Sequence, residues 1–272
     1  MTELQQRVVT GLIAAPLFLG ALYLGGYAFA AVVALIALGA QHEYYGLATS
    51  AGAPPLYPLG MAISISLLII LLHPAWWGLP LAVVLVGLVG SPFVCTSENY
   101  LQRVATTLFG VVYPAAGLLA LVLLRDALVS ASIAAFALSA WVVVAVWATD
   151  IGAYFAGKQF GRRKLAPTIS PNKTWAGALG GIAGALLIGG AYGLVDHTWD
   201  LAAIAWPHII VLSAGIAVTG QCGDLIQSLL KRTANQKDAG GLLPGHGGFF
   251  DRFDAMAIAV PVAVLYLHWI VL

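Results

Sequence analysis

Charged residues are scarce in this chain, since 12 Lys and Arg and 11 Asp and Glu make up only 8% of its 272 residues. A soluble globular domain carries roughly 25% charged residues. The low charge, together with 61% hydrophobic residues, excludes an ordinary cytosolic enzyme, a disordered chain and a coiled coil. The net charge of +1 gives no sign of a nucleic-acid partner, and we expect none.

Cysteine is also rare, because Cys95 and Cys222 are the two in the sequence and lie far apart. Two cysteines cannot form a structural zinc site or a disulfide framework. We expect two buried thiols in apolar segments.

Long apolar runs are what the sequence does have. A membrane-spanning helix needs about 20 mostly apolar residues. Nine runs free of Asp, Glu, Lys and Arg approach or reach this length: 8–24, 27–41, 57–72, 76–94, 104–124, 127–149, 175–195, 201–221 and 255–272. We therefore predict an all-α, polytopic integral membrane protein with about nine transmembrane helices, forming a single membrane domain over residues 1–272.

The basic residues orient these spans. With the N-terminus in the cytoplasm, Arg125 is the one basic residue of the 12 that falls outside, as expected if Lys and Arg collect on the cytoplasmic side. The two large polar loops, 150–174 and 223–254, then share the cytoplasmic face and belong to a catalytic half, 150–272, that follows the N-terminal helices of 1–149. The pairs Gly177/Gly181 and Gly180/Gly184 allow close helix approach, and we expect them to pack within the chain.

One candidate cluster follows the eighth run. Asp224, Ser228 and Lys231 are spaced i, i+4 and i+7, so on a continuing helix they share one face, which Arg232 borders. A carboxylate, a hydroxyl and two cations on one face suit a metal-bound phosphate. The alternative is a solvated helix end with an ion pair.

A glycine-rich loop follows this cluster. Residues 244–248 read Pro-Gly-His-Gly-Gly, in which glycine lets backbone N–H groups approach a phosphate. Asp251 and Asp254 then open the last span, where they either help to hold a divalent cation or merely cap a helix. His246 is a proton carrier, a phosphate donor or a structural turn residue, and the sequence leaves these alternatives open.

The other polar loop carries Lys158 and Lys173. Residues 152–158 nearly match a P-loop, but Gln159 stands where the magnesium-binding hydroxyl belongs, so we reject that assignment. The basic composition suits a polyanion such as a triphosphate or anionic lipid headgroups, although any cytoplasmic loop attracts positive charge.

The stretch 228–254 resembles the signature of the phosphatidate cytidylyltransferases, also called CDP-diacylglycerol synthases. The residues that match it are Ser228, Lys231, Arg232, Lys237, Asp238, Pro244, Gly245, His246, Gly247, Gly248, Asp251, Arg252 and Asp254. Two earlier motifs resemble the same family: Asp150, Gly152, Ala153, Tyr154, Gly157 and Lys158, and then Ser170, Pro171, Asn172, Lys173 and Thr174. Ala176 and Ala255 stand where the family often has Glu and Ser.

The resemblance implies transfer of the cytidylyl group of CTP to phosphatidate in membrane lipids, at a site facing the cytoplasm of a bacterial inner membrane. It implies Mg²⁺, with up to two divalent cations and room for a monovalent ion, and a homodimer. The implied catalytic residues are Asp224, Lys231, Asp251 and His246. Those implied to bind substrate are Ser228, Arg232, Lys237, Arg252, Lys173, Ser170, Lys158, Gly247 and Gly248. The implied metal ligands are Asp224, Asp251 and Asp254.

Two other functions remain open. A polytopic transporter would also place acids at a membrane boundary, but the sequence shows no inverted repeat and its polar residues gather on one face. A related nucleotidyltransferase acting on another lipid phosphate is the second.

Overall fold

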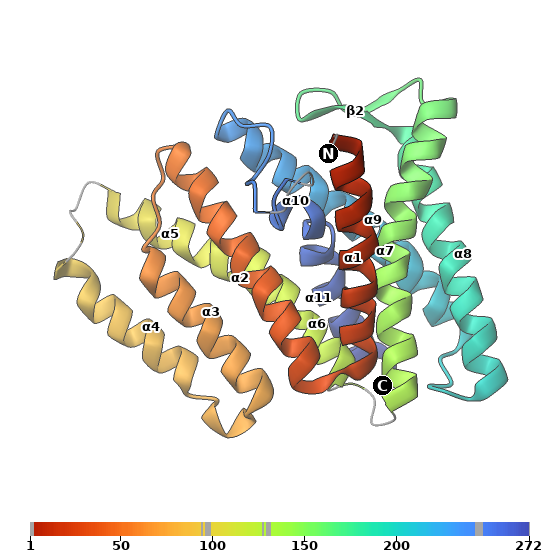
Figure 1. The fold of residues 1–272 in the computed structure, drawn as a ribbon, viewed down its shortest axis with the longest axis horizontal. Helices are drawn as coiled ribbons and strands as arrows, with labels where there is room; N and C mark the ends of the chain where they lie inside the picture. The colour runs from red at the N-terminus through yellow and green to blue at the C-terminus, as the bar shows by residue number, and fades with distance from the viewer. Residues whose placement is uncertain are drawn as a thin grey trace. The chain divides into compact units, whose positions relative to one another are not determined.

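The computed structural model describes residues 3–93, 95, 99–126, 128, 132–242 and 247–271, and most of them are helical. The α-helices are α1 (Glu3–Leu24), α2 (Gly26–Ser50), α3 (Tyr57–Leu72), α4 (Leu79–Gly90), α5 (Tyr100–Gly110), α6 (Gly117–Asp126), α7 (Ser132–Phe160), α8 (Trp175–Trp199), α9 (Trp206–Thr233), α10 (Phe250–Phe253) and α11 (Met256–Tyr266) (Figure 1). Two short 3-10 helices are η1 (Pro74–Trp76) and η2 (Ser91–Phe93), and two π-helical segments are η4 (Val111–Ala116) and η5 (Leu267–Val271).

Apolar helices of spanning length dominate the described residues. Six helices are long and apolar enough to cross a membrane: Gly26–Ser50, Pro74–Phe93, Tyr100–Asp126, Ile133–Phe160, Trp175–Trp199 and Trp206–Thr233. Three shorter apolar helices are Leu12–Leu24, Tyr57–Leu72 and Met256–Val271. Each of the predicted runs overlaps one of these segments, so the prediction of an all-α, polytopic membrane protein is confirmed.

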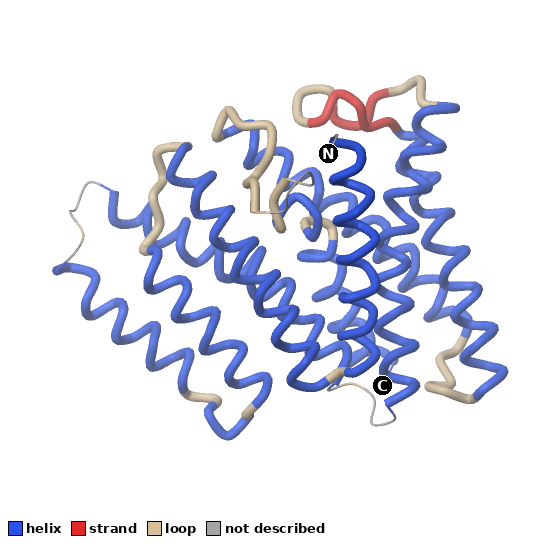
Figure 2. The backbone as a smooth tube through the Cα atoms, in the orientation of Figure 1, coloured by secondary structure: helices blue, strands red, loops and turns tan. Residues whose placement is uncertain are grey.

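Helix α7 is longer than its apolar run. It continues past Thr149 to Phe160, so residues 150–160 are helical where the sequence indicated the start of a loop. Lys158 in its last turn favours this extension, because a cation stabilises the carbonyl end of a helix. The helix ends before Gly161, and an antiparallel hairpin of β1 (Lys164–Ala166) and β2 (Ser170–Thr174) follows (Figure 2).

The chain divides into two compact units. The first unit comprises Met1–Phe18, Tyr27–Leu119 and Leu230–Phe253, and the second comprises Leu19–Gly26, Ala120–Leu229 and Asp254–Leu272.

The core of the first unit is aromatic. Tyr45 on α2 is almost fully buried and donates to the carbonyl oxygen of Thr107 at 2.9 Å. Phe250 on α10 is fully buried, and its ring lies 5.5 Å from that of Tyr113 and 6.3 Å from that of Tyr44. These contacts fix the short helix α10 against α2 and η4.

In the second unit, α7 and α8 lie side by side with small residues at the contact (Figure 1). A side chain added at Gly180 would meet Ala156 and Gly152, and one added at Gly184 would meet the carbonyl oxygen of Ala148. The expectation that these glycines pack within the chain is confirmed. The expectation for the cysteines is wrong, since Cys222 is exposed and Cys95 is only half-buried.

Arg125, the one basic residue predicted to lie outside, has a structural role in the second unit. Its guanidinium is buried and donates to the carbonyl oxygens of Leu22 at 2.7 Å and Tyr23 at 3.0 Å. These carbonyls belong to the last turn of α1, where helix groups lack partners within the helix. The cation therefore caps α1.

The close contact of α7 and α8 predicts opposite effects for two glycine substitutions on α8. Gly184→Ala forces a methyl group against the α7 backbone and should destabilise the protein by about 1–3 kcal/mol, as overpacking does. Gly190→Ala meets nothing within 4 Å and should be neutral or stabilising by up to about 1 kcal/mol, because alanine favours helix. Thermal unfolding of the purified protein in detergent measures both, and equal midpoints for the two variants would contradict this packing.

Candidate active site

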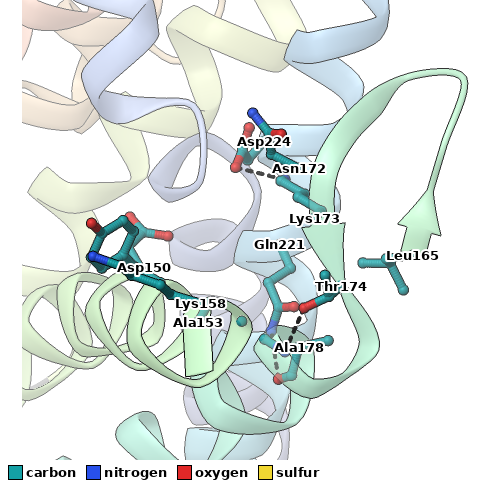
Figure 3. A pocket seen from close by; sticks show the side chains of 13 residues that line it. Asp150, Ala153, Lys158, Leu165, Asn172, Lys173, Thr174, Ala178, Gln221 and Asp224 are labelled. Carbon is teal, nitrogen blue, oxygen red and sulfur yellow. Dashed lines mark hydrogen bonds and ion pairs between the residues drawn. The ribbon is translucent and has the colours of Figure 1, made fainter. Parts of the chain in front are cut away.

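A cavity of about 550 Å³ lies within the second unit, with walls from α7, the hairpin, α8 and α9 (Figure 3). Its lining residues are Asp150, Ala153, Tyr154, Gly157, Lys158, Leu165, Asn172, Lys173, Thr174, Gly177, Ala178, Gln221 and Asp224. Two carboxylates and two lysines therefore face one space. Such a mixture can bind a phosphate group and a cation together.

Lys173 and Asp224 form an ion pair in this cavity. The Lys173 Nζ lies 2.6 Å from the Asp224 Oδ2, and the side chains are 23% and 36% exposed (Figure 3). Ser228, one helical turn after Asp224, donates its hydroxyl to the Asp224 Oδ1 at 3.4 Å. The expectation that α9 continues and brings Asp224 and Ser228 onto one face is confirmed.

The hairpin positions Lys173 locally. Thr174 ends β2 and pairs with Lys164 of β1. The Thr174 hydroxyl also accepts the N–H of Gly177 at 3.1 Å, which caps the start of α8. Because Thr174 is held at both sides, the neighbouring Lys173 leaves β2 at a fixed point of the cavity wall.

The α7 wall carries Asp150 and Lys158. Both side chains line the cavity, and the Lys158 Nζ lies 5.8 Å from the centre of the Tyr154 ring, within reach of a cation–π contact (Figure 3). Ser170, at the far end of β2, is not among the described residues that line this cavity.

Asp251 is the centre of a second cluster, in the first unit. Its Oδ1 pairs with the Lys231 Nζ at 2.9 Å, and its Oδ2 accepts the N–H groups of Ala239 at 2.8 Å and Gly248 at 3.2 Å. The side chains of Lys231 and Asp251 are 18% and 8% exposed. Burial alone would raise the pKa of the Asp251 carboxyl, but the Lys231 ammonium and the two N–H groups outweigh it and hold this pKa below its ordinary value.

The two described glycines of the glycine-rich loop have local roles. Gly247 has a φ of +78°, a backbone conformation that residues with a Cβ rarely adopt. Gly248 donates its N–H to Asp251, and a side chain added there would collide with the carboxylate of Glu43. Binding of substrate by these glycines stays a prediction. His246, with Pro244 and Gly245, lies outside the described residues.

The other residues that the sequence predicted to bind substrate or metal are divided between the two units. In the first unit, Arg232, Lys237 and Arg252 are exposed. In the second, Asp254 is buried, and its Oδ1 accepts the N–H of Ala255 at 2.8 Å. This bond does not cap α11, because a capping side chain accepts an N–H two or three residues further on, and α11 has no side-chain cap.

Two acids of these clusters were missing from the residues assigned by sequence. Asp150 appeared only within a motif, although an acid just past an apolar run is a signal for a functional site. Glu43 on α2 is 4% exposed and accepts the N–H of Phe250 at 2.8 Å. It is separated from the signature by about two hundred residues, so no local spacing indicates its role.

Comparison with known proteins connects these residues to a family. The sequence model of the cytidylyltransferase family matches residues 5–270, which are nearly the whole chain. The phosphatidate cytidylyltransferase of Synechocystis sp. is 30% identical over 293 residues, which cover 96% of each chain.

Other relatives match over shorter stretches. The phosphatidate cytidylyltransferase of Bacillus subtilis is 45% identical over 121 residues, which are 44% of each chain. That of Brucella suis is 48% identical over 122 residues, which are 45% of this chain and 43% of the relative. The aligned region thus spans less than half the length of these two relatives.

Proposed function

Because this chain belongs to the cytidylyltransferase family, we propose that it transfers the cytidylyl group of CTP to phosphatidate, forming CDP-diacylglycerol and pyrophosphate. A phosphate oxygen of the lipid attacks the α-phosphorus of CTP. The new P–O bond forms as the bond to the bridging oxygen of the β-phosphate breaks, and pyrophosphate leaves with that electron pair. The names of the relatives, including one aligned over 96% of its length, support the substrates.

The observation that carries the proposal is the pairing of the few charges. Lys173 is held beside Asp224 at 2.6 Å, and Lys231 beside Asp251 at 2.9 Å. A reaction between two anions requires cations that are oriented before the substrates arrive. Lysines that carboxylates hold in place before the substrates bind meet this requirement.

The chain's own residues then have distinct tasks. Lys173 and Lys158 line a cavity large enough for phosphate groups and are proposed to bind phosphate oxygens there. Lys231, Arg232, Lys237 and Arg252 are proposed to neutralise the remaining phosphate charge. Ser228, Ser170, Gly247 and Gly248 are proposed to donate hydrogen bonds to substrate. No protein nucleophile is needed in this reaction. His246 is proposed as a further catalytic residue.

The carboxylates fit magnesium, with up to two ions. Lysine ammonium groups lie within hydrogen-bond distance of Asp224 and Asp251, so a cation is accommodated at each carboxylate. Mg²⁺ needs only one or two protein carboxylates and completes its shell with phosphates and water. Asp224, Asp251 and Asp254 are the proposed ligands. When bound, Mg²⁺ would polarise phosphoryl oxygens and stabilise the leaving pyrophosphate.

The location follows from the two substrates. Phosphatidate stays in the bilayer, whereas CTP is dissolved in the cytoplasm. We therefore propose that the protein lies in the inner membrane of a bacterium, with the hairpin and its exposed residues Arg162, Arg163 and Lys164 on the cytoplasmic side. A homodimer and a monovalent ion remain expectations from the family resemblance.

Activity of the purified protein tests the proposal directly. Labelled CTP, phosphatidate and Mg²⁺ should yield CDP-diacylglycerol. Asp224→Asn and Asp251→Asn should each lower the turnover by about 100-fold or more, because each removes a ligand of a cation that stabilises transition-state charge. Asp200→Asn is the matched control, because Asp200 is exposed in a left-handed turn that asparagine also adopts readily.

Wild-type protein that forms no CDP-lipid would contradict the proposed reaction, and product with another lipid phosphate alone would reassign the acceptor. Full activity of either asparagine variant would remove that carboxylate from the reaction.

Cysteine labelling tests the orientation. In a variant with Cys95 and Cys222 replaced by serine, Thr168→Cys lies in the exposed turn of the hairpin and Asp200→Cys in the turn after α8. A membrane-impermeant maleimide should label Asp200→Cys in intact spheroplasts and Thr168→Cys only after lysis. The reverse pattern would invert the proposed topology.

A further inference from the structure

Glu43 is a buried acid on α2 that the proposed reaction does not use. It is 4% exposed, and its Oε2 accepts the N–H of Phe250 at 2.8 Å. Phe250 is the first residue of α10 and immediately precedes Asp251. A carboxylate is costly to bury unless hydrogen bonds replace its water, so this bond indicates a specific task for Glu43.

Two glycines make room for this carboxylate. A Cβ added at Gly240 would lie 2.5 Å from the Glu43 Oε1, and one added at Gly248 would collide with the same group. The backbone at Gly240 and at Gly248 therefore lies against the Glu43 carboxylate. A larger residue at either position would push this backbone away from α2.

Backbone groups near these glycines also bind the Asp251 carboxylate. Gly248 and Ala239 donate their N–H groups to the Asp251 Oδ2. Two carboxylates thus bind the backbone of residues 248–251. Glu43 accepts the N–H of Phe250, and Asp251 accepts the N–H of Gly248. The backbone that carries the Asp251 side chain is fixed at adjacent points.

Packing on α2 reinforces this arrangement. A side chain added at Gly39, one turn before Glu43, would lie 2.7 Å from the Phe249 ring, so that ring sits directly on the helix. Phe250 is fully buried against Tyr44 and Tyr113. Phe249 and Phe250 pack the segment against α2. The hydrogen bond from the Phe250 N–H to Glu43 fixes how the backbone of the segment is oriented.

We propose that Glu43 is a positioning residue for the cytidylyl transfer. It acts through the backbone of 248–251, holding the Asp251 carboxylate in the orientation the reaction requires, and it does not touch substrate. This inference rests on the proposed function and assigns α2, outside every signature motif, to the support of the site.

Substitutions at Glu43 test the inference. Glu43→Ala removes the acceptor of the Phe250 N–H, and kcat should fall about 100-fold, the effect of a small misplacement of a reacting group, while the KM for CTP stays within about threefold. Glu43→Gln keeps one oxygen acceptor and should recover about tenfold of that loss in kcat.

Ser50→Ala is the matched control on the same helix. Ser50 accepts a hydrogen bond from Gln236 at 3.0 Å, so its removal also breaks a contact between α2 and this segment, but far from Asp251 in the chain. Its kcat should stay within about twofold of wild type. Hydrogen–deuterium exchange of residues 247–253 should accelerate in Glu43→Ala and not in Ser50→Ala.

The outcomes separate the two claims. Wild-type protein without CDP-diacylglycerol synthesis removes the proposed function, whereas an active wild type leaves Glu43 to be judged. A folded Glu43→Ala with wild-type kcat, or with unchanged exchange at 247–253, overturns the inference. An increase of the KM for CTP that matches the loss of kcat also overturns it, because Glu43 would then act in binding. If Glu43→Ala does not fold, wild-type kcat in Glu43→Gln overturns it equally.

Discussion

The cost of taking a carboxylate out of water governs where this chain can place its few acids. That cost amounts to several kcal/mol for an unpaired ion, by order of magnitude, and must be offset by hydrogen bonds or an opposite charge. Asp251 receives the Lys231 ammonium and two backbone N–H groups, and Glu43 receives the N–H of Phe250. Asp196, fully buried, accepts the N–H groups of Ala202 and Ile204. Each acid thereby also fixes the segment that surrounds it.

The two lysine–aspartate pairs differ in what they can do. The Lys173–Asp224 pair faces a cavity with side chains 23% and 36% exposed, so a ligand can reach and replace either partner. The side chains of Lys231 and Asp251 are 18% and 8% exposed, and Asp251 is held by the backbone as well. An exposed pair contributes roughly 0–1 kcal/mol to stability and is easily opened. The Asp224 pair is therefore the more readily rearranged by substrate, and the Asp251 pair the more firmly placed.

Hydropathy predicted the helices because membrane-spanning segments are defined by local composition. The shared face of Asp224 and Ser228 was equally predictable from helical spacing. The ion pair of Lys173 with Asp224 and the hydrogen bond from Phe250 to Glu43 were not, since each joins segments brought together only by tertiary packing. The extension of α7 to Phe160 was missed for another reason, because a polar composition does not by itself end a helix.

We propose that the divalent cations that act with CTP bind at Asp224 in the second unit and at Asp251 in the first. Electron paramagnetic resonance of Mn²⁺, titrated into the purified protein with CTP, measures this binding apart from catalysis. We expect saturable binding beyond that of CTP alone, weakened at least about tenfold in Asp224→Asn and in Asp251→Asn, as loss of a metal ligand requires. Equal Mn²⁺ binding by wild type and the variant that carries both substitutions would contradict it.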